Sequence, residues 1–205
     1  MAILVSDLIL SVRSRLTDED RLKYKYPEAE VIDALNSALA HLSEALLCFT
    51  RTWVIPCKKG IGRYELPEDF LRLISVSYQG KVITDVQSME SRMNDPYPSA
   101  GVSLDLQTIH FFPGVEIKEK ENISLYYHYY ETISDKSEMI SLPKIAKETI
   151  VFYMLFLLFQ RNVSSKGIEK SNYYLRLYER ELQSFRSRVR KNQQSKHICT
   201  DYIRV

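Results

Sequence analysis

The sequence of 205 residues predicts an α+β fold, in which a helical bundle of two N-terminal and two C-terminal helices carries a β-rich insertion. Apolar residues recur every three or four positions before residue 52 and again after residue 142, as in amphipathic helices. Between these stretches the period is two, as in strands. We therefore expect N-terminal helices in 1–51, the β-rich insertion in 52–133, C-terminal helices in 134–192 and a tail in 193–205.

The first two helices are predicted by their apolar stripes. The first is expected over residues 6–16, with Ser6 as its N-cap. The second begins at Pro27, which suits the first turn of a helix, and its core-facing stripe runs from Val31 to Phe49. Asn36 lies beside this stripe, and we expect an exposed amide at the helix edge in preference to a specific polar contact.

The middle of the chain is predicted to be β-rich because short apolar runs alternate with turn residues. Ile74, Val76 and Tyr78 are expected on one face of their strand, and residues 85–93 are expected to hold a short helix. Residues 81–83 should pair back on the preceding strand, and the last two strands should pair with each other. The expected strands are Thr52–Cys57, Arg63–Leu66, Leu71–Tyr78, Lys81–Ile83, Leu104–Phe112 and Ile123–Tyr130.

The strand predicted at Ile123–Tyr130 has two unlike faces. Every second residue from Ile123 onward is apolar or aromatic, so one face suits a protein core. The opposite face is aromatic and polar, a composition that suits contact with a neighbouring protein surface. The candidate residues for a subunit interface are Tyr126, His128 and Tyr130.

Two helices are predicted in the C-terminal part. One is expected from Leu142–Pro143 to Arg161, and its Ile150–Phe159 segment is apolar on every side. Such a helix is either buried all round in the bundle or has one face in an oligomer interface. The other is expected over Ile168–Lys191, with a basic end formed by Arg186, Arg188, Arg190, Lys191 and Lys196.

The residues after this helix are expected to form a tail that is not helical. Ile198, Tyr202, Ile203 and Val205 give the tail more apolar surface than a solvated tail carries. Docking on another chain is therefore expected, in preference to a strand in the protein's own sheet.

Composition and motifs argue against several classes of protein. The formal net charge is +2, and the longest apolar run, Ile150–Phe159, is too short to span a bilayer. Three cysteines without a Cys-x-x-Cys pair and the lack of an export signal indicate a soluble protein made in the cytoplasm. Phosphate-loop, dinucleotide-binding and zinc-protease motifs are missing from the sequence, so we expect neither enzyme activity nor a cofactor or metal. The acidic cluster of Glu65, Glu68 and Asp69 is interpreted as a solvated turn.

Two short motifs and the order of the elements carry a resemblance. Leu35-Asn36-Ser37-Ala38 lies in the second predicted helix, and Gly62 is followed by Tyr64-x-Leu66-Pro67. A β-rich region and two closing helices complete the order. With these features, the chain resembles the head–tail connector (adaptor) proteins of tailed bacteriophages over nearly its whole length.

The resemblance implies a structural protein of the virion neck that is made in the host cytoplasm. Such adaptors form a ring, usually of twelve copies, which docks beneath the portal protein and extends the DNA channel. The ring presents a platform for stopper or tail proteins, and packaged DNA passes through its lumen. The implied mechanism is assembly and gating of a channel, without bond chemistry.

The resemblance also implies roles for particular residues. Adaptors commonly anchor to the portal through C-terminal extensions, and here the portal-binding candidates are Ile198, Tyr202, Ile203 and Val205, together with Arg188 and Arg190. Short basic turns in such rings often face the lumen, and the candidates for that position are Lys58, Lys59 and Lys81.

Two alternative functions stay open at this point. A nucleic-acid-binding regulator would use Arg186, Arg188, Arg190 and Lys191 to contact phosphates, although the same cations suit a solvated helix end. A tail tube or tail-completion protein would share the place in the virion but not the portal contact.

Overall fold

The predicted α+β class is confirmed, since the described residues form four helices together with several antiparallel strands. The computed structural model describes residues 2–198 apart from 19, 21–23, 59–60, 79–80, 84–85, 89–101, 105–106, 112–121 and 162–163. The chain folds into two compact units. The helical unit consists of Met1–Leu46 and Glu131–Val205, and the β unit consists of Leu47–Tyr130.

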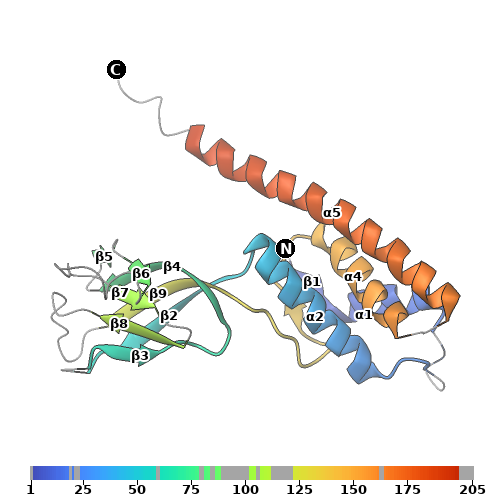
Figure 1. The fold of residues 1–205 in the computed structure, drawn as a ribbon, viewed down its shortest axis with the longest axis horizontal. Coiled ribbons are helices and arrows are strands. Elements are labelled where there is room, and N and C mark those ends of the chain that lie inside the picture. Colours follow the sequence, from blue (N-terminus) through green and yellow to red (C-terminus); the bar gives the residue numbers. More distant parts are fainter. Residues whose placement is uncertain are drawn as a thin grey trace. The chain divides into compact units, whose positions relative to one another are not determined.

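The helical unit is built around one central helix (Figure 1). The helices α1, α2 and α5 all pack against α4. A short antiparallel pair of strands, β1 and β10, joins the start of the helical unit to its second segment, which begins at Glu131. The elements are β1 (Ile3–Leu4), α1 (Val5–Leu16), α2 (Glu28–Leu46), β10 (Met139–Ile140), α4 (Ala146–Gln160) and α5 (Ser165–Ile198).

The apolar segment of α4 is covered within the chain itself. Of the residues between Ile150 and Phe159, all are buried or half-buried, which agrees with the first of the two predicted alternatives. Aromatic rings of α5 lie against this helix, and the rings of Phe159 and Tyr174 are stacked with centroids 5.6 Å apart. Helix α4 therefore forms the core of the bundle.

The start of α1 differs from the prediction. Ser6 is inside the helix, and Leu4 occupies the N-cap position without a side-chain cap. The main-chain N–H groups of Val5 and Ser6 donate to the carbonyls of Glu138 and Lys136, at 3.1 Å each. Because main-chain carbonyls of residues 136 and 138 satisfy these donors, the helix needs no hydroxyl cap.

Helix α2 is shorter than its predicted stripe. The helix ends at Leu46, and Leu47 has the left-handed conformation with φ 49°. Phe49, predicted as the last residue of the stripe, belongs to the β unit, where its ring lies 5.8 Å from that of Tyr129.

The β unit contains two four-stranded sheets. The first is antiparallel in the order β2-β9-β4-β5, and the second has the order β3-β8-β7-β6 with β6 and β7 parallel. The strands are β2 (Thr50–Pro56), β3 (Arg63–Glu65), β4 (Phe70–Tyr78), β5 (Lys81–Ile83), β6 (Val86–Ser88), β7 (Val102–Leu104), β8 (Thr108–Phe111) and β9 (Asn122–Tyr129).

These sheets confirm some predicted pairings and correct others. The pairing of β5 with β4 is confirmed. The predicted pairing of the strands near residues 104–112 and 123–130 is wrong, because β8 pairs with β3 and β7 while β9 pairs with β2 and β4. Residues 86–88 form a strand, so the predicted helix over 85–93 is also wrong there, and its other residues lie outside the described ones.

An irregularity in β4 explains a further difference. Val76 and Tyr78 are buried as expected, but Ile74 is 42% exposed. The register of β4 against β9 shifts between Leu73 and Ser75, so the alternation of inward and outward side chains is interrupted at Ile74.

Candidate assembly surfaces

The motif that begins at Gly62 forms a strand followed by a tight turn. Residues 63–65 are β3, and the N–H of Leu66 donates to the carbonyl of Gln107 at 2.8 Å. Pro67 then ends the pairing, because it has no N–H to donate. The N–H of Phe70 donates to the Pro67 carbonyl at 3.0 Å, which closes the turn before β4 begins.

Asp69, in this turn, connects three strands of the β unit. Its carboxylate accepts from Arg51 Nη1 at 2.6 Å and from the Tyr127 hydroxyl at 3.1 Å, and its carbonyl accepts from the N–H of Tyr130 at 2.9 Å. The Arg51 guanidinium also lies 4.0 Å from the centre of the Tyr129 ring. The interpretation of the acidic cluster as a solvated turn is therefore wrong for Asp69.

The same contacts affect the pKa of the Tyr127 phenol. Its side chain is 1% exposed. Burial, followed by the nearby Asp69 carboxylate, raises the pKa of Tyr127 to about 12. The phenol is thus a hydrogen-bond donor to Asp69 over the whole physiological pH range.

Asn36 makes a specific contact, contrary to the prediction of a helix-edge amide without one. Its Nδ2 donates to the carbonyl of Ile133 at 3.0 Å, and its Oδ1 accepts from the N–H of Ile133 at 2.8 Å. Both hydrogen-bonding groups of one peptide residue are satisfied by one side chain. Asn36 therefore fastens the segment after residue 130 to α2 within the helical unit.

The two faces of β9 differ as predicted. Ile123, Leu125 and Tyr127 are buried, whereas Tyr126 is 41% exposed and His128 and Tyr130 are half-buried. On the outer face, Val54, Ser124, Ser77 and Val82 follow one another across the four strands of the sheet. Val54 and Val82 are 49% and 62% exposed. The outer face thus combines hydroxyl groups with exposed apolar side chains.

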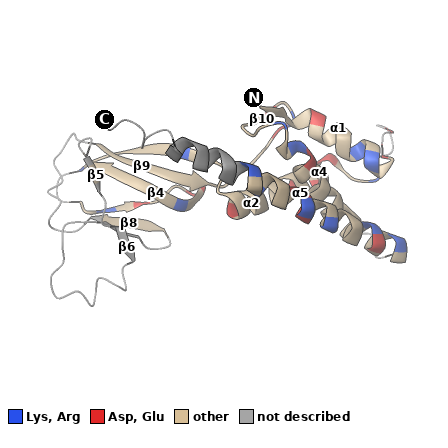
Figure 2. Ribbon diagram, turned by 90° about the horizontal axis from the view of Figure 1, so that it is seen from above, with Lys and Arg blue, Asp and Glu red and all other residues tan. Residues whose placement is uncertain are grey.

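Helix α5 carries the predicted basic end but is longer than expected. It runs to Ile198, so the prediction that the helix stops after Lys191 is wrong. Arg188 is exposed, and the backbones of Arg190 and Ile198 are helical. Figure 2 shows Lys and Arg recurring along α5. Tyr202, Ile203 and Val205 lie outside the described residues.

The lysines predicted to face a lumen are described in part. Lys58 is exposed after β2, and its N–H donates to the Tyr64 hydroxyl at 3.2 Å. Lys81 begins β5, but its side chain lies outside the described part of the chain, as does Lys59 altogether.

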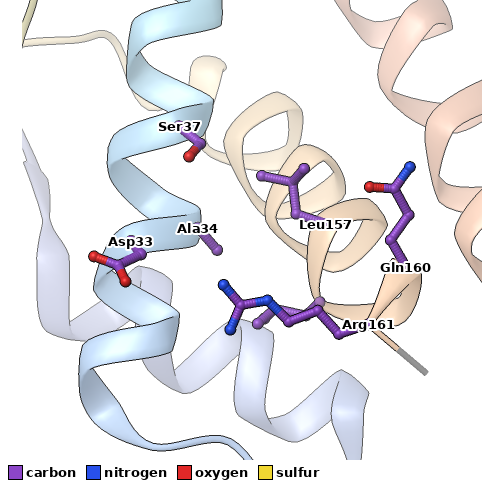
Figure 3. Close-up of a pocket in the computed structure, with 7 residues that line it drawn as sticks. Asp33, Ala34, Ser37, Leu157, Gln160 and Arg161 are labelled. Carbon is purple, nitrogen blue, oxygen red and sulfur yellow. The ribbon is translucent and has the colours of Figure 1, made fainter. Parts of the chain in front are cut away.

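A groove between α2 and α4 was not predicted. It has a volume of about 510 Å³, and small residues of α2, Ala34 and Ser37, leave room for it. Figure 3 shows Arg161 reaching from the end of α4 toward α2. Arg161 pairs with Glu30 at 2.9 Å. Sequence alone offered one signal for this groove, the small side chains of Ala34 and Ser37.

A second unpredicted groove lies on α5, and its volume is about 730 Å³. Aromatic rings and arginines line it, among them Tyr153, Tyr178 and Arg186. The Tyr178 hydroxyl is hydrogen-bonded to His41 Nδ1 at 2.6 Å, and burial together with the nearby Tyr153 raises the pKa of Tyr178. The partner of Tyr178 could not be derived from residue spacing, because His41 lies 137 positions earlier in the chain.

Two further observations concern chemistry and membranes. Among the residues that the structure describes, no cluster of three His, Cys, Asp or Glu side chains is arranged to hold a metal ion. Within the same residues, none of the helices combines the length and apolar character that a bilayer span requires.

Comparison with known families identifies the class of protein that this fold defines. A family model described as SU10 adaptor protein matches residues 3–198, nearly the whole chain. The chain therefore belongs to this family of phage head–tail adaptors, as its motifs and element order predicted. It is a phage adaptor protein and a component of the virion. No curated protein matches the chain.

Proposed function

We propose that this phage adaptor is a structural protein of the virion neck. A ring of copies joins the portal to the stopper or tail proteins and extends the channel through which packaged DNA leaves during ejection. The observation that carries this proposal is the family match over residues 3–198, which includes both compact units. The function is assembly, so the relevant chemistry is that of protein surfaces.

The ring is proposed to contain twelve copies that contact one another through the outer face of the sheet around β9. A closed ring reuses one heterologous interface at every subunit. Tyr126 is 41% exposed there, and His128 and Tyr130 are half-buried beside it. Tyrosine suits such contacts because its ring is apolar and its hydroxyl still reaches a polar partner.

The portal contact is proposed to lie at the end of α5 and in the residues after it. The exposed Arg188 and the neighbouring Arg190 supply positive charge, and Ile198, Tyr202, Ile203 and Val205 supply apolar side chains. Such side chains stabilise a complex by roughly 1.5–3 kcal/mol each before the costs of ordering the segment. The proposed lumen residues are Lys58, Lys59 and Lys81, which would meet the DNA backbone as it passes.

Deletion of His197 to Val205 tests the portal contact. The deletion removes two residues of α5 and the segment beyond it, and none of the core residues named above. The shortened protein should stay folded by circular dichroism and should no longer co-sediment with portal rings. Unchanged co-sedimentation would contradict the proposed contact, and loss of the helical signal would mean that the segment belongs to the protein's own core.

The basic end of α5 supports a second candidate function. No acidic residue follows Glu181 within α5, so Arg186, Arg188, Arg190 and Lys191 could contact phosphates of nucleic acid. A gel-shift experiment with duplex DNA separates the candidates. If the protein is a monomer that shifts DNA and does not bind portal rings, it is a nucleic-acid-binding regulator and not a neck protein.

A further inference from the structure

The antiparallel sheet of the β unit ends in two strands that are paired on one side. In the order β2-β9-β4-β5, strands β2 and β5 are the edges, and within the described part of the chain no further strand pairs with either. The outer side of an edge strand presents main-chain N–H and carbonyl groups, which can pair with a strand of another chain. The question is which groups these two edges present.

The outward main-chain groups of β2 follow from its pairing with β9. The N–H of Tyr129 donates to the carbonyl of Phe49 at 3.3 Å, and the register continues from there without a shift to Pro56. Hydrogen-bonded and non-hydrogen-bonded positions alternate in an antiparallel pair, so the odd-numbered residues of β2 bond to β9. The even-numbered residues Thr50, Thr52 and Val54 therefore point their N–H and carbonyl groups away from the sheet.

The same alternation identifies one such residue on the opposite edge. Because the odd-numbered residues of β9 bond to β2, its even-numbered residues, which include Ser124, bond to β4. Ser77 lies opposite Ser124 and bonds to β9, so it does not bond to β5. Val82 is the residue of β5 that lies opposite Ser77. The N–H and carbonyl of Val82 therefore point away from the sheet.

Val54 and Val82 also stand at the two ends of one row of side chains on the outer face of the sheet. Ser124 and Ser77 lie between them in this row. Val54 is 49% exposed and Val82 is 62% exposed. Aliphatic side chains that lie opposite each other on neighbouring strands stabilise the strand pair. Contact between these two valines would remove apolar surface of both from water.

Strand β2 lacks most of the features that block pairing at an edge. Its seven residues pair with β9 without a bulge. Its one charged residue, Arg51, is held by the Asp69 carboxylate at 2.6 Å. Pro56 has no N–H to donate, but it stands at the end of the strand. The edge is thus open to strand addition between Thr50 and Val54.

The directions of the two edges also match. Strands β2 and β4 are both antiparallel to β9, and β5 is antiparallel to β4, so β5 runs opposite to β2. A sheet that continues into a second copy therefore places β5 of that copy antiparallel to β2. Val54 and the partner's Val82 can then exchange two main-chain hydrogen bonds while their side chains share the outer face.

We infer that β2 of one copy pairs antiparallel with β5 of a second copy, with Val54 opposite the partner's Val82. The inference rests on the proposed ring and names the strands that meet in it. Two different edges meet, so the contact is heterologous and can close into a ring. Tyr126 belongs beside this contact, because its hydroxyl donates to Thr50 Oγ1 at 3.2 Å. Since β5 has three residues, the pairing forms on the portal and not between free monomers.

Disulfide cross-linking of the full chain tests the pairing. The test protein carries Val54→Cys together with Val82→Cys. Within one chain these positions are three strand spacings apart, roughly 14 Å, which is too far for a disulfide. Oxidation after assembly on portal rings should give a ladder of covalent oligomers on a non-reducing gel. The protein with its own three cysteines and each single substitution should give no ladder.

A matched pair of cysteines controls for exposure. Ile74 is 42% exposed, but it lies in β4, inside the sheet and away from both edges. The protein with Val54→Cys and Ile74→Cys should therefore give no ladder under the same conditions. A ladder equal to that of the Val54 and Val82 pair would mean that any two exposed positions cross-link, and it would overturn the inference.

Proline at position 54 tests the main-chain hydrogen bond. The N–H of Val54 points away from β9, so Val54→Pro keeps the bonds between β2 and β9 and removes the donor at the proposed contact. This variant should stay folded by circular dichroism and should assemble on portal rings about tenfold more weakly. Val54→Thr keeps the N–H and the branched shape, and it should weaken assembly by less than about threefold.

The readouts separate this inference from the proposed function. A second ring on the portal by electron microscopy, without a ladder from the Val54 and Val82 cysteine pair, would overturn the strand pairing and leave the ring in place. Bare portal rings would contradict the proposed function. The oxidation is then repeated with concentrated protein alone, where a ladder supports the pairing and its absence overturns it.

Two further results would also overturn the pairing. One is a cross-linked dimer from Val54→Cys alone, because two β2 edges would then meet around a twofold axis. The other is equal weakening by Val54→Pro and Val54→Thr, because the valine side chain and not the main-chain bond would then make the contact. If Val54→Pro does not fold, the cysteine ladder decides.

Discussion

Single side chains in the two motifs hold the protein's irregular segments in place. Asn36 binds both main-chain groups of Ile133, and Asp69 joins Arg51 to Tyr127. The family motifs of this chain thus include residues whose role in the structure is to fix main-chain geometry, so that the surfaces of each unit are presented in one shape.

Replacement of Asn36 by alanine should lower the free energy of unfolding by about 2 kcal/mol, because the half-buried N–H and carbonyl of Ile133 lose their partner. Urea denaturation followed by circular dichroism measures the change. The neighbouring Ser37→Ala change, at an exposed position, should alter stability by less than about 0.5 kcal/mol. Equal effects of the two changes would show that the Asn36 contact contributes nothing specific.

Tyr127 makes the stability of the β unit sensitive to alkaline pH. Its pKa in the folded protein is about 12, compared with 10.0 for an unperturbed tyrosine, so the folded state holds the phenolic proton more tightly. The contribution of Tyr127 is therefore complete below pH 10 and is lost as pH rises through 12. Phenolate absorbance during an alkaline titration should show one tyrosine signal that disappears on Tyr127→Phe. A titration unchanged by that substitution would contradict the assignment.

At the scale of elements, the turn that ends α1 contains one residue with a strained backbone conformation. Thr17 has φ 54°, a left-handed conformation that a β-branched residue adopts at a cost. The N–H groups of Thr17 and Asp18 donate to the carbonyls of Ser14 and Arg13, the pattern in which glycine usually occupies the left-handed position.

Thr17→Gly should therefore raise the free energy of unfolding by about 1 kcal/mol, because the strain that glycine removes outweighs the loss of the hydrogen bond from the exposed Thr17 hydroxyl to the Leu16 carbonyl. Thr17→Ala is the matched control, since alanine keeps the Cβ atom and should give no such gain. Thermal denaturation of the three proteins measures the difference. A stabilisation by alanine equal to that by glycine would point to the threonine side chain and not to the backbone conformation.

The sequence predicted the helices better than the strand partners, and the reason is physical. Helix periodicity is local, so the core-facing sides of α1 and α2 were visible from spacing, and the buried segment of α4 was visible from its run of apolar residues. Strand β9 lies between β2 and β4, which precede it far along the chain, and no local pattern specifies that order. The extension of α5 was missed because its last residues have no apolar stripe, although helix propagation can continue through lysine and glutamine.

The candidate surfaces were predictable to different degrees. The difference between the two faces of β9 was predicted from the alternation of residue types, because successive side chains of a strand point to opposite sides. The contact of Asn36 with Ile133 joins residues 97 positions apart, and that of Tyr178 with His41 joins residues 137 positions apart. Spacing within one sequence carries information on neither.

At the scale of the whole molecule, ring formation is proposed to use the outer face of the sheet around β9. Tyr126→Asp should leave the isolated protein folded and should weaken assembly on portal rings by about tenfold or more, because it places a charge in an apolar contact. Tyr173→Asp is the control, since Tyr173 is a tyrosine on α5 that is even more exposed, at 58%. Co-sedimentation with portal rings measures assembly. Equal weakening by both substitutions would count against the β9 face.

Electron microscopy of negatively stained portal rings mixed with the purified protein tests the central claim most directly. The account predicts a second ring, coaxial with the portal and with an open channel, that is absent when the protein lacking His197 to Val205 is used. Portal rings that stay bare at saturating protein concentration would contradict the claim that this adaptor forms the ring beneath the portal.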